Sequence, residues 1–361
     1  GFANFRDYIF PAKFRFDYTP EDCERFHAAV ERVVVPAVER VFEARRRRLG
    51  LAELRPWDLA VDPYRNQALR PFSNAEELVT QAQRVFTRVD PTLGNEFQTM
   101  IDEHLLDLDS RKGKAPGGYC ETLHFQGRPF IFMNAVGLVD DVMTLLHEAG
   151  HAFHAFASHP LPLIWQRHPG SEAAELASMS MELLAAPHLV QPTGYFSQQD
   201  ARSAWLEHLE DVLVSLAHIA SVDAFQTWIY TSGQGHDAAA RDEAWSQIRG
   251  RFERGVDWSN LEEERKARWY RQLHIFMYPF YYIEYGIAQL GAVQVWRNSL
   301  EDPARAVARY REALSLGAVR TLPEIYRTAG ARLIFDVDEM GQLVQLVERH
   351  IERLRADLDR G

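Results

Sequence analysis

The chain lacks the features that mark secreted, membrane-spanning and nucleic-acid-binding proteins. It holds 2 cysteines in 361 residues, Cys23 and Cys120, which are too few and too far apart for a disulfide framework. No uninterrupted apolar run reaches the roughly 18 residues of a membrane-spanning helix, and no signal peptide opens the sequence. The formal net charge of −11 argues against nucleic acid or an anionic membrane as a partner. We therefore expect a cytoplasmic protein with no nucleic-acid or membrane partner.

Internal repeats, low-complexity segments and a convincing linker are also missing. Apolar residues make up 46% of the chain, which is enough to bury a large core. The pattern is mainly that of amphipathic helices. The sequence therefore predicts one extended, mainly α-helical domain over residues 1–361.

The helices are predicted from N-terminal capping residues, from prolines and from the apolar period. Their expected spans are Thr19 to about Gly50 with a kink at Pro36, Ser73 or Asn74 to Val89, Pro91 to Leu106, Ser197 to about Tyr230, Asp237 to Phe252, Leu261 to Trp296 with a break near Tyr278, and Asp336 to Asp359. The exception to the helical pattern is the stretch 112–134. Residues 119–125 and 129–133 read as short strands joined by a turn, so a small β-sheet should lead into the next helix.

That next helix carries the most informative motif of the chain, the HExxH formed by His147, Glu148 and His151. A spacing of four residues places both imidazoles on one helix face, where they can bind one metal ion, and Glu148 beside that face can reach a water on the metal. This is half of the ligand set of a zinc hydrolase. The alternative is a buried helix whose histidines only make hydrogen bonds. His154 lies one turn on, and we interpret it as a packing or second-shell residue, because a fourth ligand would close the site.

A catalytic zinc site needs a third protein ligand and an open position. The predicted helix that starts near Ser171 offers Glu172, Glu175 and Glu182. Glu175 and Glu182 are seven residues apart and share one face, and Glu172 joins that face at a spacing of three. Spacing alone does not choose between Glu172 and Glu175.

The strand that begins at Tyr119 follows Gly117 and Gly118. An exposed sheet edge beside the metal would hold an extended peptide by main-chain hydrogen bonds, and the two glycines would let its backbone come close. Gly117, Gly118 and Tyr119 are therefore candidate substrate-binding residues. The alternative is a structural hairpin whose glycines serve only the turn.

A second candidate cluster consists of His274 and the tyrosines 278, 281, 282 and 285. Tyr278, Tyr282 and Tyr285 follow the spacing i, i+4, i+7, and a phenol or imidazole donor would stabilise the oxyanion of amide hydrolysis. The three tyrosines could therefore share one helix face, and we expect Tyr281 to point away from it. Aromatic residues at helical spacing are commonly core, which is the alternative.

These motifs together resemble the thimet oligopeptidase and oligoendopeptidase F group of zinc peptidases. HExxH is followed by Glu175, 24 residues after the second histidine, and then by Glu182. The resemblance to oligoendopeptidase F extends over essentially the whole chain. The further segments that carry it are residues 1–7, 55–58, 113–120 and 279–286. Family members carry a helical lobe before this region, and we expect that lobe to lie outside this chain.

The resemblance implies a multi-helix, zincin-like metallopeptidase catalytic domain with a small β-sheet beside the HExxH helix. It implies one Zn²⁺ per chain held by His147, His151 and Glu175, with Glu182 as a carboxylate next to a ligand histidine. Glu148 would be the general base. The implied transition-state and substrate-binding residues are His274, Tyr282 and Tyr285, with Tyr278 as a further contact. Short oligopeptides would be the substrates.

Two other functions remain possible from the sequence. One is a zinc hydrolase that acts on a non-peptide amide in a smaller pocket. The other is a helical binding protein whose HExxH is inert, which metal analysis would reveal.

Overall fold

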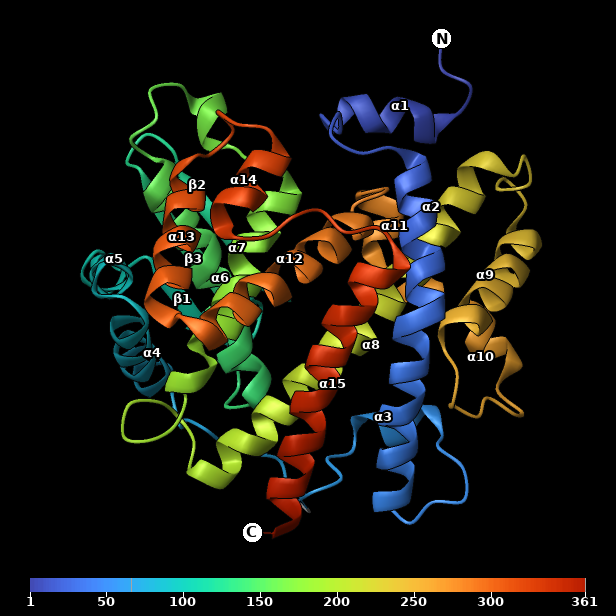
Figure 1. The fold of residues 1–361 in the computed structure, drawn as a ribbon, viewed down its shortest axis with the longest axis horizontal. Coiled ribbons are helices and arrows are strands. Elements are labelled where there is room, and N and C mark those ends of the chain that lie inside the picture. Colours follow the sequence, from blue (N-terminus) through green and yellow to red (C-terminus); the bar gives the residue numbers. More distant parts are fainter. Residues whose placement is uncertain (66, 361) are drawn as a thin grey trace. The chain divides into compact units, whose positions relative to one another are not determined.

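The computed structural model describes residues 1–65 and 67–360 and is mainly helical, with a small β-sheet (Figure 1). The chain divides into two compact units, which are described separately. Unit 1 comprises Gly1–Gln67, Glu207–Ile287 and Ile334–Arg353. Unit 2 comprises Ala68–Leu206, Ala288–Leu333 and the chain from Leu354 onward. The helices α8 (Gln198–Thr231), α12 (Tyr282–Glu301) and α15 (Val337–Arg360) contain residues of both units. The prediction of one domain over residues 1–361 stays a prediction.

Unit 1 is built from helices whose ends follow local capping rules. Its further helices are α1 (Phe5–Ala12), α2 (Pro20–Ala29), α3 (Val35–Arg48), α9 (Ala238–Phe252), α10 (Glu262–Ala267) and α11 (Leu273–Met277). Thr19 and Asp22 form a capping box at the start of α2, with Pro20 at the first helical position. The kink expected at Pro36 is a π-helical segment, Val30–Val34, that ends just before α3. The helical segment predicted there is therefore confirmed, with an interruption slightly earlier than Pro36.

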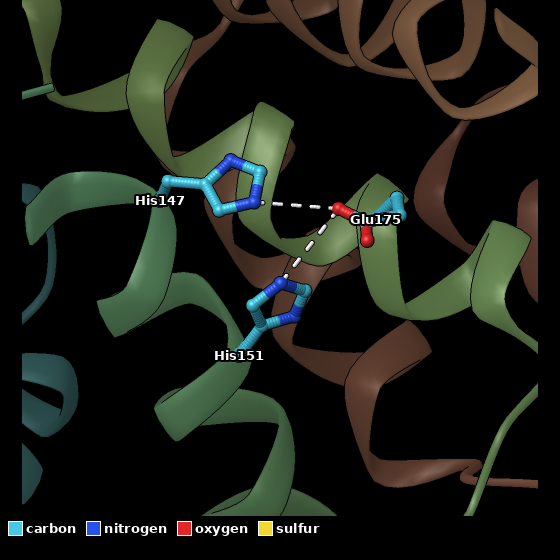
Figure 2. Close-up of side chains that lie close together, drawn as sticks. All are labelled: His147, His151 and Glu175. Atoms are coloured by element: carbon cyan, nitrogen blue, oxygen red, sulfur yellow. Dashed lines mark ion pairs between the residues drawn. The ribbon is translucent and has the colours of Figure 1, made fainter. Parts of the chain in front are cut away.

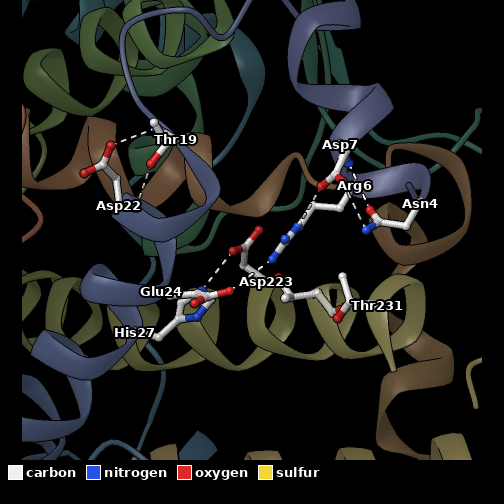
Figure 3. Close-up of polar contacts among 10 residues, drawn as sticks. Asn4, Arg6, Asp7, Thr19, Asp22, Glu24, His27, Asp223 and Thr231 are labelled. Carbon is white, nitrogen blue, oxygen red and sulfur yellow. Dashed lines mark hydrogen bonds and ion pairs between the residues drawn. The ribbon is translucent and has the colours of Figure 1, made fainter. Parts of the chain in front are cut away.

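Polar contacts join α1 to α2 and α2 to α8 in unit 1 (Figure 3). His27 of α2 lies 2.8 Å from Asp223 of α8, through Nε2 and Oδ2, and both side chains are buried. Arg6 of α1 donates a hydrogen bond of 3.0 Å to Glu24 of α2. This buried hydrogen bond therefore joins α2 to α8 in the interior of unit 1.

Unit 2 contains the sheet and the helices that surround it. Its elements are α4 (Ala75–Val89), α5 (Pro91–Asp102), β1 (Leu106–Asp109), β2 (Tyr119–Leu123), β3 (Arg128–Ala135), α6 (Val139–Ser158), α7 (Ser171–Ala185), α13 (Pro303–Ser315) and α14 (Leu322–Ala329). The strand order is β1–β3–β2, with β1 parallel and β2 antiparallel to β3. Tyr119 pairs with Phe132 and Leu123 with Arg128. The sheet predicted before the HExxH helix is confirmed, and β2 is an edge strand.

The first strand, β1, corrects the sequence prediction, which extended a helix to Leu106. Helix α5 ends at Asp102, and His104 adopts a left-handed backbone with φ of 56°. That conformation stops a helix, because side chains other than glycine rarely continue from it. Leu106 then pairs with Ile131 of β3. The sheet partner lies more than twenty residues away, so the local helical pattern did not reveal this strand.

Helix α6 packs on β3 and on α7 in the centre of unit 2 (Figure 1). Its start is set by Asp141, whose carboxylate accepts the backbone N–H groups of Val136 and Leu138 at 2.8 and 2.7 Å. Leu145 and Phe153 are fully buried on one side of the helix. The helix predicted to start near Ser171 is α7, whose first helical residue is Ser171 and whose cap position is Gly170.

Helix α8 is the longest apolar helix described. It contains an 18-residue window with a mean hydropathy of 1.3, which by length and composition alone could cross a membrane. Of that window, 61% is buried inside the protein, and the core helix of a globular protein passes the same test. The expectation of no membrane partner therefore stays a prediction.

Candidate metal centre

Helix α6 presents His147 and His151 one turn apart, as their spacing predicts. Their ring centroids are 5.0 Å apart and the ring planes are nearly perpendicular, at 84°. Both side chains are partly exposed, at 24% and 22%. The two imidazole edges are therefore open to a common point beside the helix.

Glu175 of α7 is the carboxylate that reaches this point (Figure 2). Its Oε2 lies 3.3 Å from His147 Nε2 and 3.7 Å from His151 Nε2. Ligand atoms of His147, His151 and Glu175 all lie within 4.8 Å of one another, and Glu172 is not part of the group. The packing of α7 on α6 thus brings Glu175, and not Glu172, next to both histidines.

The three atoms fit a zinc ion. Tetrahedral coordination with bonds of about 2.0–2.1 Å separates ligand atoms by about 3.4 Å, close to the distances from Glu175 to the two histidines. Two imidazoles and one carboxylate are also a donor set of catalytic zinc sites, in which a fourth position stays open. The residues present therefore suit this metal without a change of fold.

Burial and hydrogen bonding act differently on the two histidines. Glu182 Oε1 lies 2.6 Å from His147 Nδ1, which orients the other nitrogen toward Glu175. Burial opposes a charge on His147, but its hydrogen bonds to Glu175 and Glu182 outweigh this and raise its pKa well above the usual range. Burial lowers the pKa of His151 to about 4, so this ring is the neutral form that binds metals. His154 is buried outside the group, and burial lowers its pKa to about 3.

Glu148 lies between the metal group and the sheet. The side chain is buried, and it accepts a hydrogen bond from the backbone N–H of Cys120 in β2. Burial raises the pKa of Glu148 to about 7; the nearby charge on His147 lowers it and those on Glu175 and Glu182 raise it. A carboxyl that titrates near neutral pH is suited to taking up and releasing a proton. The contact with Cys120 has no signal in the sequence, because a backbone donor carries no residue preference.

The edge of the sheet places the three predicted substrate-binding residues next to α6. Gly117 has a φ of 100° and open space where a Cβ would lie, whereas a Cβ on Gly118 would meet Thr144 of α6 at 3.2 Å. Tyr119 is half exposed, and its ring stacks on Phe132 at 4.9 Å. β2 is the edge strand beside β3, which is the position that an added peptide strand requires.

The tyrosine cluster belongs to unit 1, where it surrounds His274. The centroid of the His274 ring lies 5.1 Å from that of Tyr282, 5.7 Å from Tyr281, 5.9 Å from Tyr285 and 6.1 Å from Tyr278. Burial raises the pKa of Tyr282 to about 12, so its hydroxyl keeps its proton at neutral pH. The structure thus gathers all four tyrosines about the histidine.

Two expectations for this cluster are wrong. Helix α12 begins at Tyr282, so Tyr278 does not share a helical face with Tyr282 and Tyr285. Tyr281 does not point away, because its ring also lies 5.0 Å from Tyr285. The reason is Phe280, whose left-handed backbone, with φ of 61°, interrupts the helical phase after the predicted break.

Comparisons with known proteins identify the family and the fold of the chain. The model of peptidase family M3 matches residues 1–338. The oligoendopeptidase F homolog of Lactococcus lactis subsp. lactis (strain IL1403) is 21% identical over 91% of this chain and 53% of its own length. Oligopeptidase PepF of Bacillus subtilis (strain 168) is 22% identical over 82% of this chain and 43% of its own.

A solved structure of PZ peptidase A with an inhibitor superposes with a TM-score of 0.91 at 32% identity, over 98% of this chain and 62% of that one. The chain therefore spans about half the length of the curated relatives it matches. The predicted resemblance and the predicted fold class are both confirmed: this chain belongs to peptidase family M3.

Proposed function

We propose that the chain is the catalytic part of a zinc-dependent endopeptidase that hydrolyses short oligopeptides. The observation that carries the proposal is the group formed by His147, His151 and Glu175, with Glu148 beside it. One zinc ion per chain would be held by this group, with Glu182 orienting His147. Zinc at such a site supplies Lewis acidity, because it polarises a carbonyl and lowers the pKa of water.

The residues of the chain would provide the proton transfer. Glu148 takes a proton from the attacking water and then gives it to the leaving amine, which requires a carboxyl that exchanges protons near neutral pH. The backbone N–H of Cys120 would keep the carboxylate of Glu148 in place while it first accepts the proton and then donates it.

The substrate would bind as an extended strand along β2. Main-chain groups of the strand would pair with the peptide, and Gly117, Gly118 and Tyr119 would line its path. In unit 1, His274, Tyr282 and Tyr285 would donate to the oxyanion or the adjacent peptide group, with Tyr278 as a further substrate contact. Relatives named as oligopeptidases support short peptides as the substrate class.

Metal content and peptide hydrolysis together test the proposal. Purified protein should carry close to one equivalent of zinc and cleave an internally quenched peptide, and His147→Ala and His151→Ala should lose both properties. His104→Ala, an exposed histidine outside the group, is the matched control and should lose neither. Full zinc content in both ligand variants would overturn the metal assignment. Zinc binding with hydrolysis of small amides but of no peptide would instead indicate the non-peptide hydrolase.

A further inference from the structure

The backbone of α7 comes unusually close to α6 at Gly150, directly before the ligand His151. A Cβ added to Gly150 would lie 2.5 Å from the Cα of Ser178 and 2.7 Å from the carbonyl oxygen of Ala177. Both are backbone atoms of α7, so neither moves aside as the end of a side chain would. A side chain at position 150 would therefore push the two helices apart at the level of the metal ligands.

Ser178 lies at this contact and touches the ligand on α7. Its side chain is fully buried, and its Oγ lies 3.1 Å from Glu175 Oε2 and 3.0 Å from the Glu175 carbonyl oxygen. Oε2 is the same oxygen that faces both histidines. A hydroxyl that donates to this oxygen restricts the rotation of the carboxylate.

Tyr310 of α13 holds the same turn of α7 through its hydroxyl. This buried hydroxyl donates to the carbonyl oxygen of Ala177 at 2.9 Å. That oxygen is the second atom for which Gly150 leaves space. One carbonyl of α7 is therefore in close contact with α6 and hydrogen-bonded to α13.

We propose that Gly150, Ser178 and Tyr310 are positioning residues of the metal centre. Gly150 lets α7 approach until Glu175 reaches His147 and His151, Tyr310 fixes the turn at Ala177, and Ser178 orients the carboxylate. All three act through Glu175. The proposal rests on the proposed function, because it requires that the group binds zinc.

Zinc affinity separates this role from a merely structural one. We expect Gly150→Ala and Ser178→Ala each to weaken zinc binding by about 10- to 100-fold, measured by competition with a chromophoric chelator, as typical losses of supporting contacts do. Tyr310→Phe removes only a hydroxyl and should weaken zinc binding several-fold. The melting temperature of each metal-free variant is measured in parallel.

Two matched controls come from the same unit. A Cβ on Gly94 would lie 2.8 Å from the Cα of Thr87, so Gly94→Ala creates a similar clash between α4 and α5. It should lower the melting temperature and leave zinc affinity unchanged. Ser180 is fully buried on α7, and its Oγ has no hydrogen-bond partner in the described part of the chain. Ser180→Ala should therefore also retain wild-type zinc affinity.

The outcomes distinguish the two proposals. If the wild-type protein binds zinc while Ser178→Ala and Tyr310→Phe bind it equally well, the positioning role is wrong and the proposed function stands. A Gly150→Ala variant that loses thermal stability but keeps its zinc affinity, as is expected of Gly94→Ala, would likewise show that Gly150 has no positioning role. If the wild-type protein binds no zinc, both proposals are overturned. Because Ser178→Ala and Tyr310→Phe leave the backbone contact intact, the test survives a Gly150→Ala variant that does not fold.

Discussion

Glu148 is the residue whose surroundings most directly predict a chemical role. It lies beside the metal group but is not a ligand, and burial raises its pKa to about 7. Replacement by glutamine keeps the shape and removes the exchangeable proton. We therefore expect Glu148→Gln to retain zinc and to lower kcat by about 100-fold or more. Atomic absorption and peptide hydrolysis on the same sample check both parts, and near-normal turnover with zinc bound would rule out the general-base role.

The carboxylates of α7 differ in what they contact, and their variants should differ accordingly: Glu175 faces both histidines, Glu182 lies on the far nitrogen of His147, and Glu172 is outside the group. Glu175→Ala should release zinc, because it removes a ligand atom. Glu182→Ala should weaken zinc about 10- to 100-fold, because His147 loses its orienting partner. Glu172→Ala should bind zinc as the wild type does, since this residue lies outside the group. Zinc titrations of the three proteins measure this order, and a loss of zinc only in Glu172→Ala would show that the third ligand was misassigned.

The hydroxyls of the tyrosine cluster can be removed one at a time without loss of the rings. If Tyr282 and Tyr285 donate to the oxyanion, each phenylalanine variant should lower kcat by about 100-fold with zinc still bound. Tyr270→Phe is the control, because that hydroxyl donates to Asp242 elsewhere in unit 1. A larger loss in Tyr281→Phe than in both others would assign the donor to Tyr281, whose ring also lies in the cluster.

At the scale of elements, α5 contains a partly buried carboxyl, that of Glu96, which should make the stability of the protein depend on pH. Burial raises the pKa of Glu96 to about 7, although Arg311 partly opposes this. The folded state therefore holds a proton that the unfolded state releases above pH 4.5, so stability is lost as the pH rises from about 4.5 to 7.

Glu96→Gln should remove this loss. We expect the free energy of unfolding to rise by about 1–3 kcal/mol at pH 8 and to stay nearly unchanged at pH 4. Urea unfolding at the two pH values measures the difference. Glu103→Gln, at the end of the same helix, is the control: Arg128 lowers the pKa of Glu103, so this variant should not gain stability at pH 8. An equal gain at both pH values would show that folding does not raise the pKa of Glu96.

Local rules account for most of the elements. Thr19, Asn74 and Asp237 each cap the helix predicted to begin there. These assignments succeed because a capping side chain binds a backbone N–H only two or three residues away. Strand β1 was not predicted, because its partner β3 follows it at a distance in the sequence, and its register depends on that pairing.

At the scale of the whole molecule, zinc should stabilise the fold because its ligands lie on two different helices. Removal of the metal with a chelator should lower the melting temperature, and re-addition of zinc should restore it. At a free zinc concentration 1,000 times Kd the stabilisation is about 4 kcal/mol. The same protein carrying His147→Ala and His151→Ala should melt at one temperature with and without zinc. An equal response of both proteins would place the stabilising metal elsewhere.

The sequence by itself determined the features that depend on residues close together along the chain. The HExxH motif predicts that both imidazoles lie on one face of a helix, because residues four apart in a helix are one turn apart. Only the tertiary structure brought Glu175 rather than Glu172 to the histidines, grouped all four tyrosines around His274, and brought the backbone of Cys120 to Glu148. These contacts join separate elements, and the packing that makes them depends on the whole core, which no local pattern encodes.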